Sequence, residues 1–390
     1  MFRGAPWEIA VHIPERGGGD VLLDLPELVY YEEPVSAEVE GEKITLELPF
    51  GLGPIELAQD GLRLVGTSSI GEERLDVVLH RTERNVRSGR REVEVPTPNG
   101  VLKGTLLLPP GKGPFPAVVI AHGSGPSLRT RWEYRSNGVF YARRGYAALI
   151  YDKRDPTADL SDLARDVGHC FEFLKTQPEV VPTRIGMMGG SQAAWLIAAV
   201  APAARPSFIH LNSAPAETPR EVEFDATALR VRANGGDATD ESIARTYLGL
   251  YFAAAMTGRN IEAVQAEADL LPEEDWTEVL PIPAGYDELQ WWRRNADFGK
   301  GTLWKGIDCP VLLLYGERDT AVPPLKSGPM IRELLLSSGN RDVTMRLFRG
   351  ADHRLEASSG FVDNRWRWPR MADGYVETVE EWLRMVATSR

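Results

Sequence analysis

Six short, densely apolar runs separated by helical patterns constrain the fold of this chain more than any other feature. Runs without polar alternation are expected for strands that are buried on both faces of a mostly parallel sheet. Between them, apolar residues recur at helical spacing, as in residues 160–177. The six runs are residues 116–123, 146–153, 184–191, 207–214, 310–317 and 344–350. This alternation of strand and helix predicts an α/β domain with a doubly wound, mostly parallel sheet.

The pattern of apolar and polar residues divides the chain into three regions. Residues 1–90 contain short alternating runs between Gly- and Glu-rich turns, which predicts a small all-β domain, as one antiparallel sheet or an open barrel, with no polar cluster that suggests chemistry. A charged linker leads into a hairpin that opens the α/β domain, residues 91–213 and 305–390. Residues 214–304 contain no convincing strand, which predicts a helical insertion rich in aromatic residues.

The net charge and the length of the apolar runs exclude some classes of binding partner. Lys and Arg number 44 and Asp and Glu 56, and the net charge of −12 argues against nucleic acid or an anionic membrane surface as a partner. No apolar run reaches the ~20 residues that span a bilayer. Residues 1–20 lack the apolar centre and cleavage site of an export signal, which predicts a cytoplasmic protein unless a signal has been removed. Cys170 and Cys309 lie outside any C-x-x-C pair, which predicts two buried free thiols and no metal site.

One serine is placed on a sharp turn between a buried strand and an apolar helix. The sequence GGSQA, residues 189–193, follows the pattern G-x-S-x-G except at Ala193. Such a turn strains the backbone of the serine and exposes its hydroxyl above the sheet, while small neighbours avoid a clash. The start of the helix adds partial positive charge beside it. This context predicts that Ser191 is a nucleophile rather than an incidental serine in a glycine-rich turn.

A second glycine-rich loop follows the first dense strand. The sequence HGSG, residues 122–125, resembles the HGGG-type loop whose backbone N–H contributes to an oxyanion hole. We expect the backbone amides of Ser124 and Gln192 to be the two donors, with Gly123 as the alternative to Ser124 and as part of the substrate pocket. His122 is expected to brace the loop rather than to act as a base.

A serine hydroxyl needs a base, and one of the six histidines has a suitable place in the sequence. His353 lies in a loop after a late strand, whereas the others lie within predicted strands, on a helix or before the glycine loop. Asp319 follows an earlier strand and would fix the imidazole tautomer. Glu317 and Asp352 are its rivals as the acid.

Taken together, residues 92–390 resemble the α/β-hydrolase superfamily. More narrowly, they are similar to bacterial serine esterases related to the prolyl-oligopeptidase and dienelactone-hydrolase branches, some of which carry an N-terminal β module. The motifs that carry this resemblance occur in the family's order: HGSGP, YDKR, LARDVGHCFEFLK, GGSQA, YGERD and ADH. The order serine, aspartate, histidine is also that of the family's triad. One motif departs, because the family usually continues YDKR with glycine and here Asp155-Pro156 follows.

The resemblance implies hydrolysis of a small-molecule carboxylic ester, with a small or medium acyl group, through an acyl-serine intermediate. His353 would remove the proton of Ser191, protonate the leaving alcohol and then activate water. No metal or organic cofactor would be needed. The insertion at residues 214–304 would lie over the serine as a cap.

Other functions are compatible with the same residues. Thioesterases and lactonases use the same machinery, and a serine peptidase or aminopeptidase is disfavoured because the β module is too short for a β-propeller gate. A haloalkane dehalogenase would need aspartate in place of Ser191. A non-catalytic binding protein is disfavoured because all three triad residue types are present in order. The oligomeric state, including a homo-oligomer, is open.

Aromatic residues of the insertion have two interpretations of equal weight. Trp291, Trp292 and Tyr286 either line an apolar acyl pocket or pack the insertion onto the core. Leu128, Arg129 and Arg131 follow the oxyanion loop; contact with the substrate is one interpretation, and simple solvation is the favoured one.

Overall fold

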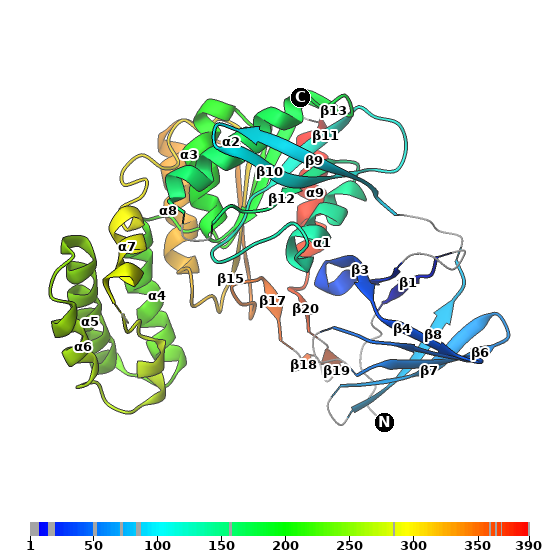
Figure 1. Cartoon of the computed structure of the whole chain (residues 1–390), viewed down its shortest axis with the longest axis horizontal. Helices are drawn as coiled ribbons and strands as arrows, with labels where there is room; N and C mark the ends of the chain where they lie inside the picture. The colour runs from blue at the N-terminus through cyan, green and yellow to red at the C-terminus, as the bar shows by residue number, and fades with distance from the viewer. Residues whose placement is uncertain are drawn as a thin grey trace.

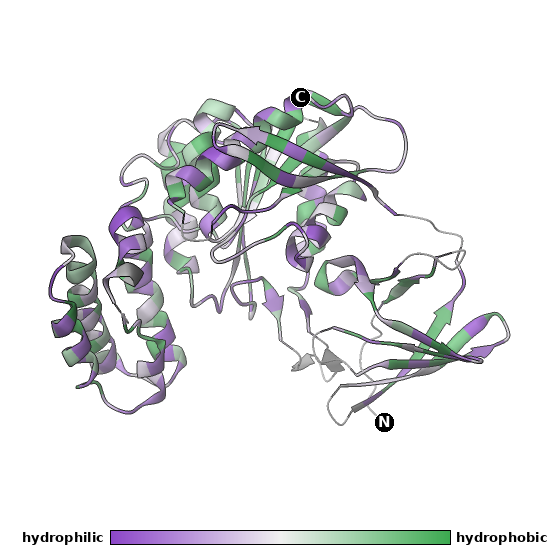
Figure 2. Cartoon of the chain, in the orientation of Figure 1, coloured by the Kyte–Doolittle hydropathy of each residue, from purple (hydrophilic) through white to green (hydrophobic). Residues whose placement is uncertain are grey.

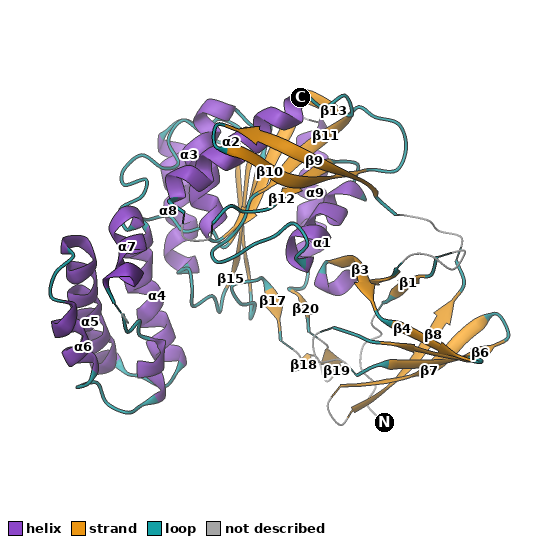
Figure 3. Ribbon diagram, viewed as in Figure 1, coloured by secondary structure: helices purple, strands orange, loops and turns teal. Residues whose placement is uncertain are grey.

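A large central sheet carries helices on both faces, and two N-terminal β sheets and a group of helices are attached to it (Figures 1 and 3). Within the described residues, no helix combines the length and the apolar character needed to cross a membrane. The computed structural model describes residues 8–14, 20–49, 53–70, 73–82, 87–155, 158–283, 285–358, 360–362, 365–367 and 369–388.

The central sheet has eight strands in the order β16-β15-β14-β13-β11-β12-β10-β9. The predicted hairpin is β9 and β10, and β10 also pairs antiparallel with β12. All other neighbours are parallel, so the six dense apolar runs form six parallel strands and the predicted doubly wound sheet is confirmed. The strands are β9 (Gly89–Thr97), β10 (Gly100–Leu108), β11 (Phe115–Ile120), β12 (Ala147–Tyr151), β13 (Val180–Gly190), β14 (Ile209–Asn212), β15 (Val311–Gly316) and β16 (Val343–Phe348).

Helices cover both faces of this sheet because successive side chains of a strand point to opposite faces. In β11, Val119 packs in the apolar cluster of α2, α3 and α8, whereas Val118 packs in the cluster of α1 and α9. Figure 2 shows that the middle of the sheet is mainly hydrophobic. Cys170 and Cys309 are both buried and outside any disulfide, as predicted. The helices are α1 (Trp132–Ala142), α2 (Leu160–Lys175), α3 (Gln192–Ala204), α8 (Pro324–Ser337) and α9 (Tyr375–Thr388).

Two antiparallel sheets precede the central sheet, rather than the single sheet or open barrel that was predicted. The first contains β1, β2 and β3, and the second contains β4 to β8 in sequence order. The β character of this region is thus confirmed. The elements are β1 (Ala10–His12), β2 (Val21–Leu25), η1 (Pro26–Leu28), β3 (Tyr30–Val35), β4 (Ala37–Glu40), β5 (Lys43–Leu46), β6 (Ile55–Asp60), β7 (Arg63–Ile70) and β8 (Glu73–His80).

The first of these sheets is joined to α1 by buried ion pairs. Asp24, Glu32 and Glu33 expose only 2%, 1% and 1% of their surface. Arg143, directly after α1, pairs with Asp24 and Glu32, and Arg135 of α1 pairs with Glu33. A buried charge that loses its partner is strongly destabilising, so these pairs hold the sheet firmly to the helix. These buried charges form a polar cluster at the junction between the sheet and α1, and each acid is paired with an arginine.

Within the described residues, positions 214–304 form helices and no strand. They have an apolar cluster of their own, which includes Tyr247, Tyr251 and Trp276. The last helix contacts the central domain: the side-chain oxygen of Asn295 accepts a hydrogen bond from the backbone N–H of Leu160, the first residue of α2, at 2.7 Å. The elements are α4 (Pro219–Ala233), α5 (Ala238–Thr257), α6 (Ile261–Ala268), η2 (Asp275–Val279) and α7 (Tyr286–Asn295).

The connection between β16 and α9 contains four short strands that the sequence pattern did not predict. They form two antiparallel pairs, β17 with β20 and β18 with β19. Figure 1 places them below the carboxyl end of β15, between the central sheet and the N-terminal sheets. The strands are β17 (Glu356–Ala357), β18 (Gly360–Val362), β19 (Arg365–Arg367) and β20 (Arg370–Met371).

Candidate active site

The parallel strands bring the predicted residues to one edge of the sheet, at their carboxyl ends. The strand order reverses at β11, because the chain continues to β12 on one side of it and returns to β13 on the other. Crevices outside such a reversal are the usual ligand sites of open α/β sheets. The loop 122–125 follows β11 and Ser191 follows β13, and a Cβ on Gly123 would lie 3.6 Å from the carbonyl oxygen of Gly190. The loop and the serine turn are therefore neighbours at this reversal.

Ser191 occupies the predicted sharp turn between β13 and α3. Its backbone has φ 55° and ψ −126°, a combination that costs a residue with a side chain about 1–3 kcal/mol. The backbone N–H of Ser191 donates to the carbonyl oxygen of Asn212 at 3.0 Å, which ties the turn to β14. Strain of this kind persists only where the surroundings determine it, and such residues cluster at functional sites.

The glycines before Ser191 are required by close packing in the turn. A Cβ on Gly189 would lie 2.5 Å from the Cβ of Ala193, and a Cβ on Gly190 would lie 3.2 Å from the carbonyl oxygen of Asn212. The first and last positions of the pattern thus face each other. Ala193 is accommodated because Gly189 has no side chain, which explains the departure from the final glycine.

Asp319 and His353 form a hydrogen-bonded pair at the same edge of the sheet. Asp319 follows β15, His353 follows β16, and Nδ1 of His353 lies 2.8 Å from Oδ2 of Asp319. The other oxygen, Oδ1, accepts the backbone N–H groups of Ala321 and Val322, each at 2.8 Å. The carboxylate is completely buried, whereas 31% of the imidazole is exposed. Asp319 is thus fixed by three contacts, and the histidine keeps an open side.

The two rival acids are engaged elsewhere. Oε2 of Glu317 accepts the backbone N–H of Gly350 at 2.9 Å. Oδ1 of Asp352 accepts the backbone N–H groups of Arg354 and Glu356 at 2.9 and 3.0 Å, so it braces the loop that carries the histidine. Of the three acids that were considered, the described contacts join only Asp319 to the His353 ring.

Ser213, which the sequence analysis did not consider, links the two halves of the site. Its hydroxyl donates to the carbonyl oxygen of His353 at 2.9 Å. The preceding residue, Asn212, accepts the backbone N–H of Ser191. Asn212, the last residue of β14, and Ser213, directly after it, therefore contact the serine turn and the histidine loop. In the sequence, Ser213 stands directly after a buried strand that follows the serine strand, and this position could have marked it as a site residue.

The predicted oxyanion donors lie on either side of the sheet reversal. Gln192 is buried and is the first residue of α3, where a backbone N–H has no partner within the helix. Ser124 is exposed and Gly123 is half-buried in the loop after β11. These positions agree with a pair of backbone donors, one from the start of α3 and one from the loop after β11.

His122 is buried between two aromatic rings and is unsuited to act as a base. Its ring contacts those of Tyr134 and Tyr151 edge-on, at 4.4 and 4.3 Å between centroids. Burial, and then the nearby positive charge of Lys153, lower the pKa of His122 to about 3. The ring is therefore neutral at ordinary pH, as expected of a residue that packs the loop.

The arginines after the oxyanion loop are engaged in internal ion pairs. Arg129 pairs with Asp152 and Glu92, and Arg131 pairs with Glu133. Asp152 and the neighbouring Lys153 and Arg154 belong to the motif that departs from the family pattern. Asp155 after them is described, and Pro156 lies outside the described residues.

The three aromatic residues proposed for an acyl pocket have separate surroundings. Trp291 packs against the central apolar cluster, while Trp292 packs against the cluster of the helical region, with Phe252 edge-on at 5.0 Å. The two tryptophan rings meet each other at 5.0 Å. The hydroxyl of Tyr286 accepts the backbone N–H of Ile261 at 3.2 Å. Packing contacts thus account for much of their surface, and their part in a pocket stays a prediction.

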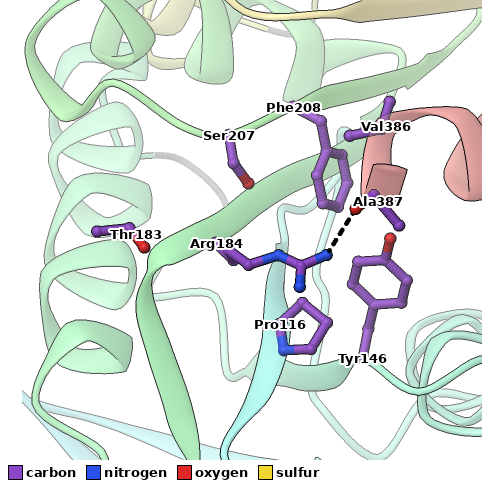
Figure 4. A pocket seen from close by; sticks show the side chains of 8 residues that line it. All are labelled: Pro116, Tyr146, Thr183, Arg184, Ser207, Phe208, Val386 and Ala387. Atoms are coloured by element: carbon purple, nitrogen blue, oxygen red, sulfur yellow. Dashed lines mark hydrogen bonds between the residues drawn. The ribbon is translucent and has the colours of Figure 1, made fainter. Parts of the chain in front are cut away.

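A cavity of about 360 Å³ lies away from these residues, at the amino ends of the strands (Figure 4). Arg184 crosses it and donates to the carbonyl oxygen of Ala387 at 3.3 Å. Since Ser191, Asp319 and His353 follow the carboxyl ends of their strands, this cavity lies at the opposite edge of the sheet. Across the part of the chain that the structure describes, no three His, Cys, Asp or Glu side chains gather in a way that could hold a metal ion.

Comparison with known proteins finds an esterase that is similar along most of the chain. No protein-family model matches the chain. The chain is 25% identical to the esterase EstD of Thermotoga maritima over 353 residues, which are 87% of this chain and 78% of that protein. The structure of this chain adds the order of its central sheet, the strained serine turn after β13, and the acid and histidine after β15 and β16. The chain has the α/β-hydrolase fold.

Other proteins match this chain over shorter stretches or with lower identity. It is 30% identical over 186 residues to the peroxisomal succinyl-coenzyme A thioesterase of Mus musculus, covering 47% of this chain and 41% of that protein. The chain thus spans less than half of that relative. A solved structure of DcsB with its substrate analogue superimposes with a TM-score of 0.48 and 18% identity, over 77% of this chain and all of that one. An esterase of Pyrobaculum calidifontis gives a TM-score of 0.48 and 14% identity, over 77% and 86%.

Proposed function

We propose that this α/β-hydrolase cleaves carboxylic esters with small to medium acyl groups through an acyl-serine intermediate. One observation carries the proposal: a buried, three-fold hydrogen-bonded Asp319 holds His353 at the sheet edge where Ser191 sits in a strained turn. The similarity to a protein named as an esterase, along most of the chain, supports a hydrolase of the carboxylesterase type.

The Asp319–His353 contact determines what the imidazole can do. An ionised carboxylate only accepts hydrogen bonds, so Nδ1 of His353 carries the proton and Nε2 is left with a free lone pair. Nε2 would accept the proton of the Ser191 hydroxyl as it attacks the ester carbonyl. The resulting imidazolium would protonate the leaving alcohol, and neutral His353 would then activate the water that releases the acid.

Backbone N–H groups would stabilise the negative charge on the substrate oxygen. We assign these donors to Gln192, at the start of α3, and Ser124, in the loop after β11. Each such donor is worth about 2.7–4 kcal/mol of barrier in a preorganised site. The partial positive charge at the start of α3 acts in the same direction.

The helices α4 to α7 would form a cap over this edge of the sheet. They connect β14 to β15, and α7 contacts the start of α2 through Asn295. Trp291 packs against the central apolar cluster. Of the three aromatic residues, it is therefore the one that we propose as a wall of the acyl pocket. We accordingly propose residues 91–213 and 305–390 as the catalytic domain and residues 214–304 as the cap.

A thioester is the second candidate substrate, because part of the chain is similar to a coenzyme A thioesterase. The same acyl-serine chemistry would serve, with a thiol in place of the alcohol as leaving group. The two candidates are separated by matched substrates that share one acyl group.

A substrate panel on wild type and Ser191→Ala tests the proposal. Wild type is expected to hydrolyse short-chain p-nitrophenyl esters faster than the thioester of the same acid and to leave the anilide uncleaved, while Ser191→Ala is inactive on all three. Faster hydrolysis of the thioester would favour the second candidate. A folded wild-type protein that is inert to esters and thioesters of every acyl length would refute the proposal.

A further inference from the structure

Lys153 is a buried cation that the proposed mechanism does not use. It follows β12 and exposes only 6% of its surface. Its ammonium donates three hydrogen bonds, to the carbonyl oxygens of Gly123 and Gly125 at 2.9 and 3.0 Å and to the side-chain oxygen of Gln192 at 2.9 Å. An ammonium has three N–H donors, so each of them has a partner.

The charged neighbours of Lys153 along the chain do not compensate its charge. Asp152 pairs with Arg129, and Arg154 pairs with Asp166. The ammonium is therefore stabilised only by the dipoles of its three oxygen partners. Burial of a cation without an opposite charge has a high cost in free energy. An apolar side chain of similar length would fill the space without this cost, so packing does not account for a lysine at this position.

The three acceptors of Lys153 belong to the two segments that are predicted to supply the oxyanion donors. Gly123 and Gly125 flank Ser124 in the loop after β11, and Gln192 begins α3. Glycines leave this loop with much backbone freedom, and Gly125 uses it, with φ +80°. A single ammonium that holds both carbonyls removes that freedom and joins the loop to the helix.

The carbonyl of Gly123 also sets the direction of the next amide. The peptide bond between Gly123 and Ser124 is trans, so its C=O and N–H point in opposite directions. Because the C=O points at Lys153, the N–H of Ser124 must point away from Lys153. Rotation of this one peptide unit would remove the donor from the site.

We propose that Lys153 is a positioning residue for hydrolysis, which holds the 123–125 loop against Gln192 so that the N–H groups of Ser124 and Gln192 converge on one oxygen. This inference rests on the proposed function of Ser191. It assigns Lys153 no contact with the substrate; the residue acts through the loop.

A consequence is an alkaline limit to turnover. Burial lowers the pKa of Lys153 to about 8, and the neutral amine offers two N–H donors for three acceptors. The other titratable groups that face this site do not change charge near that pH. His122 is already neutral, and burial raises the pKa values of Tyr134 and Tyr151 above their usual value of 10. Turnover should therefore fall as the pH rises through about 8.

The test compares Lys153→Met and Lys153→Arg with a matched control, Lys305→Met. Lys305 also donates to a glycine carbonyl, that of Gly301 at 2.7 Å, but on the exposed surface. Lys153→Met is expected to lower kcat for a p-nitrophenyl ester about 100-fold with KM within about 3-fold, because a misplaced donor acts on the transition state. The control should keep the wild-type kcat and the fall above pH 8.

The pH profile distinguishes positioning from packing. Arginine keeps its charge above pH 8, so Lys153→Arg should restore part of kcat and lose the alkaline fall. An unchanged kcat in folded Lys153→Met would overturn the inference. So would a fall in turnover above pH 8 in Lys153→Arg that matches the fall in wild type. If Lys153→Met does not fold, the result for Lys153→Arg decides. A wild-type enzyme without esterase activity would instead refute the proposed function.

Discussion

The two halves of the candidate site are held in place by different means. The turn that carries Ser191 is fixed by backbone hydrogen bonds and by the lack of side chains at Gly189 and Gly190. Asp319 and His353 are fixed by side-chain hydrogen bonds, to each other and to neighbouring backbone groups. The first half is thus a property of how the main chain packs, and the second is a property of particular side-chain atoms.

Because of this difference, some substitutions should change activity without changing stability, and others should change stability first. A side-chain atom of the acid half can be exchanged for another of the same shape, which should remove activity and leave the fold. An added atom in the serine half has no space to occupy, so it should change the fold first.

Asp319→Asn should have the largest effect on activity. Oδ1 can still accept the two backbone N–H groups, but the new amide N–H₂ faces Nδ1 of His353 and favours the wrong tautomer. We expect kcat for a p-nitrophenyl ester to fall by about 10³–10⁴-fold, while thermal unfolding shows a loss of no more than about 1 kcal/mol.

Asp352→Asn is the matched control for this change. Asp352 also accepts two backbone N–H groups through one oxygen, and it adjoins His353 without contacting its ring. It should keep kcat within about 3-fold of wild type. If Asp352→Asn or Glu317→Gln were the inactive variant and Asp319→Asn the active one, the acid would be misassigned.

Gly189→Ala should act mainly on stability. The new Cβ would lie 2.5 Å from the Cβ of Ala193, so α3 must shift, at a cost of about 1–3 kcal/mol in the free energy of unfolding. Gly249→Ala, in α5, is the control: its Cβ has no atom within 4 Å, and alanine there should stabilise the helix by up to about 1 kcal/mol. Urea unfolding of both variants measures the difference. Equal stability of the two would show that the turn yields easily and would remove the proposed division.

Ser213→Ala should have the smallest effect, since it loosens one support of the histidine loop. The loss of its hydrogen bond to the carbonyl of His353 removes about 0.5–1.5 kcal/mol, and we expect kcat to fall by about 2- to 10-fold. Ser338→Ala removes a comparable bond, to the carbonyl of Leu334 in α8, and should leave kcat unchanged. Equal kcat in both variants would mean that the histidine loop needs no support from Ser213.

Much of the central sheet could be predicted because burial on both faces leaves a direct mark on the sequence. The six apolar runs all form parallel strands. The strained turn at Ser191 was also visible, because only glycine-rich sequence fits such a turn. In both cases the cause and the signal lie within a few residues of each other.

The features that were not predicted depend on partners far along the chain. Glu33 is buried against Arg135, about a hundred residues later, and nothing near either residue announces the pair. The contacts of Lys153 with the glycine loop and Gln192 have the same origin. The short strands β17 to β20 carry too few residues for a pattern and exist through tertiary pairing alone.

The most direct test of the central claim is labelling of the enzyme with a fluorophosphonate, followed by peptide mapping and measurement of residual ester hydrolysis. We predict one adduct, on Ser191, whose extent matches the loss of activity, and labelling at least about 100-fold slower in His353→Ala because the serine has lost its base. Hydrolysis that continues after Ser191 is fully modified, or inhibition with the adduct on another residue, would contradict the account.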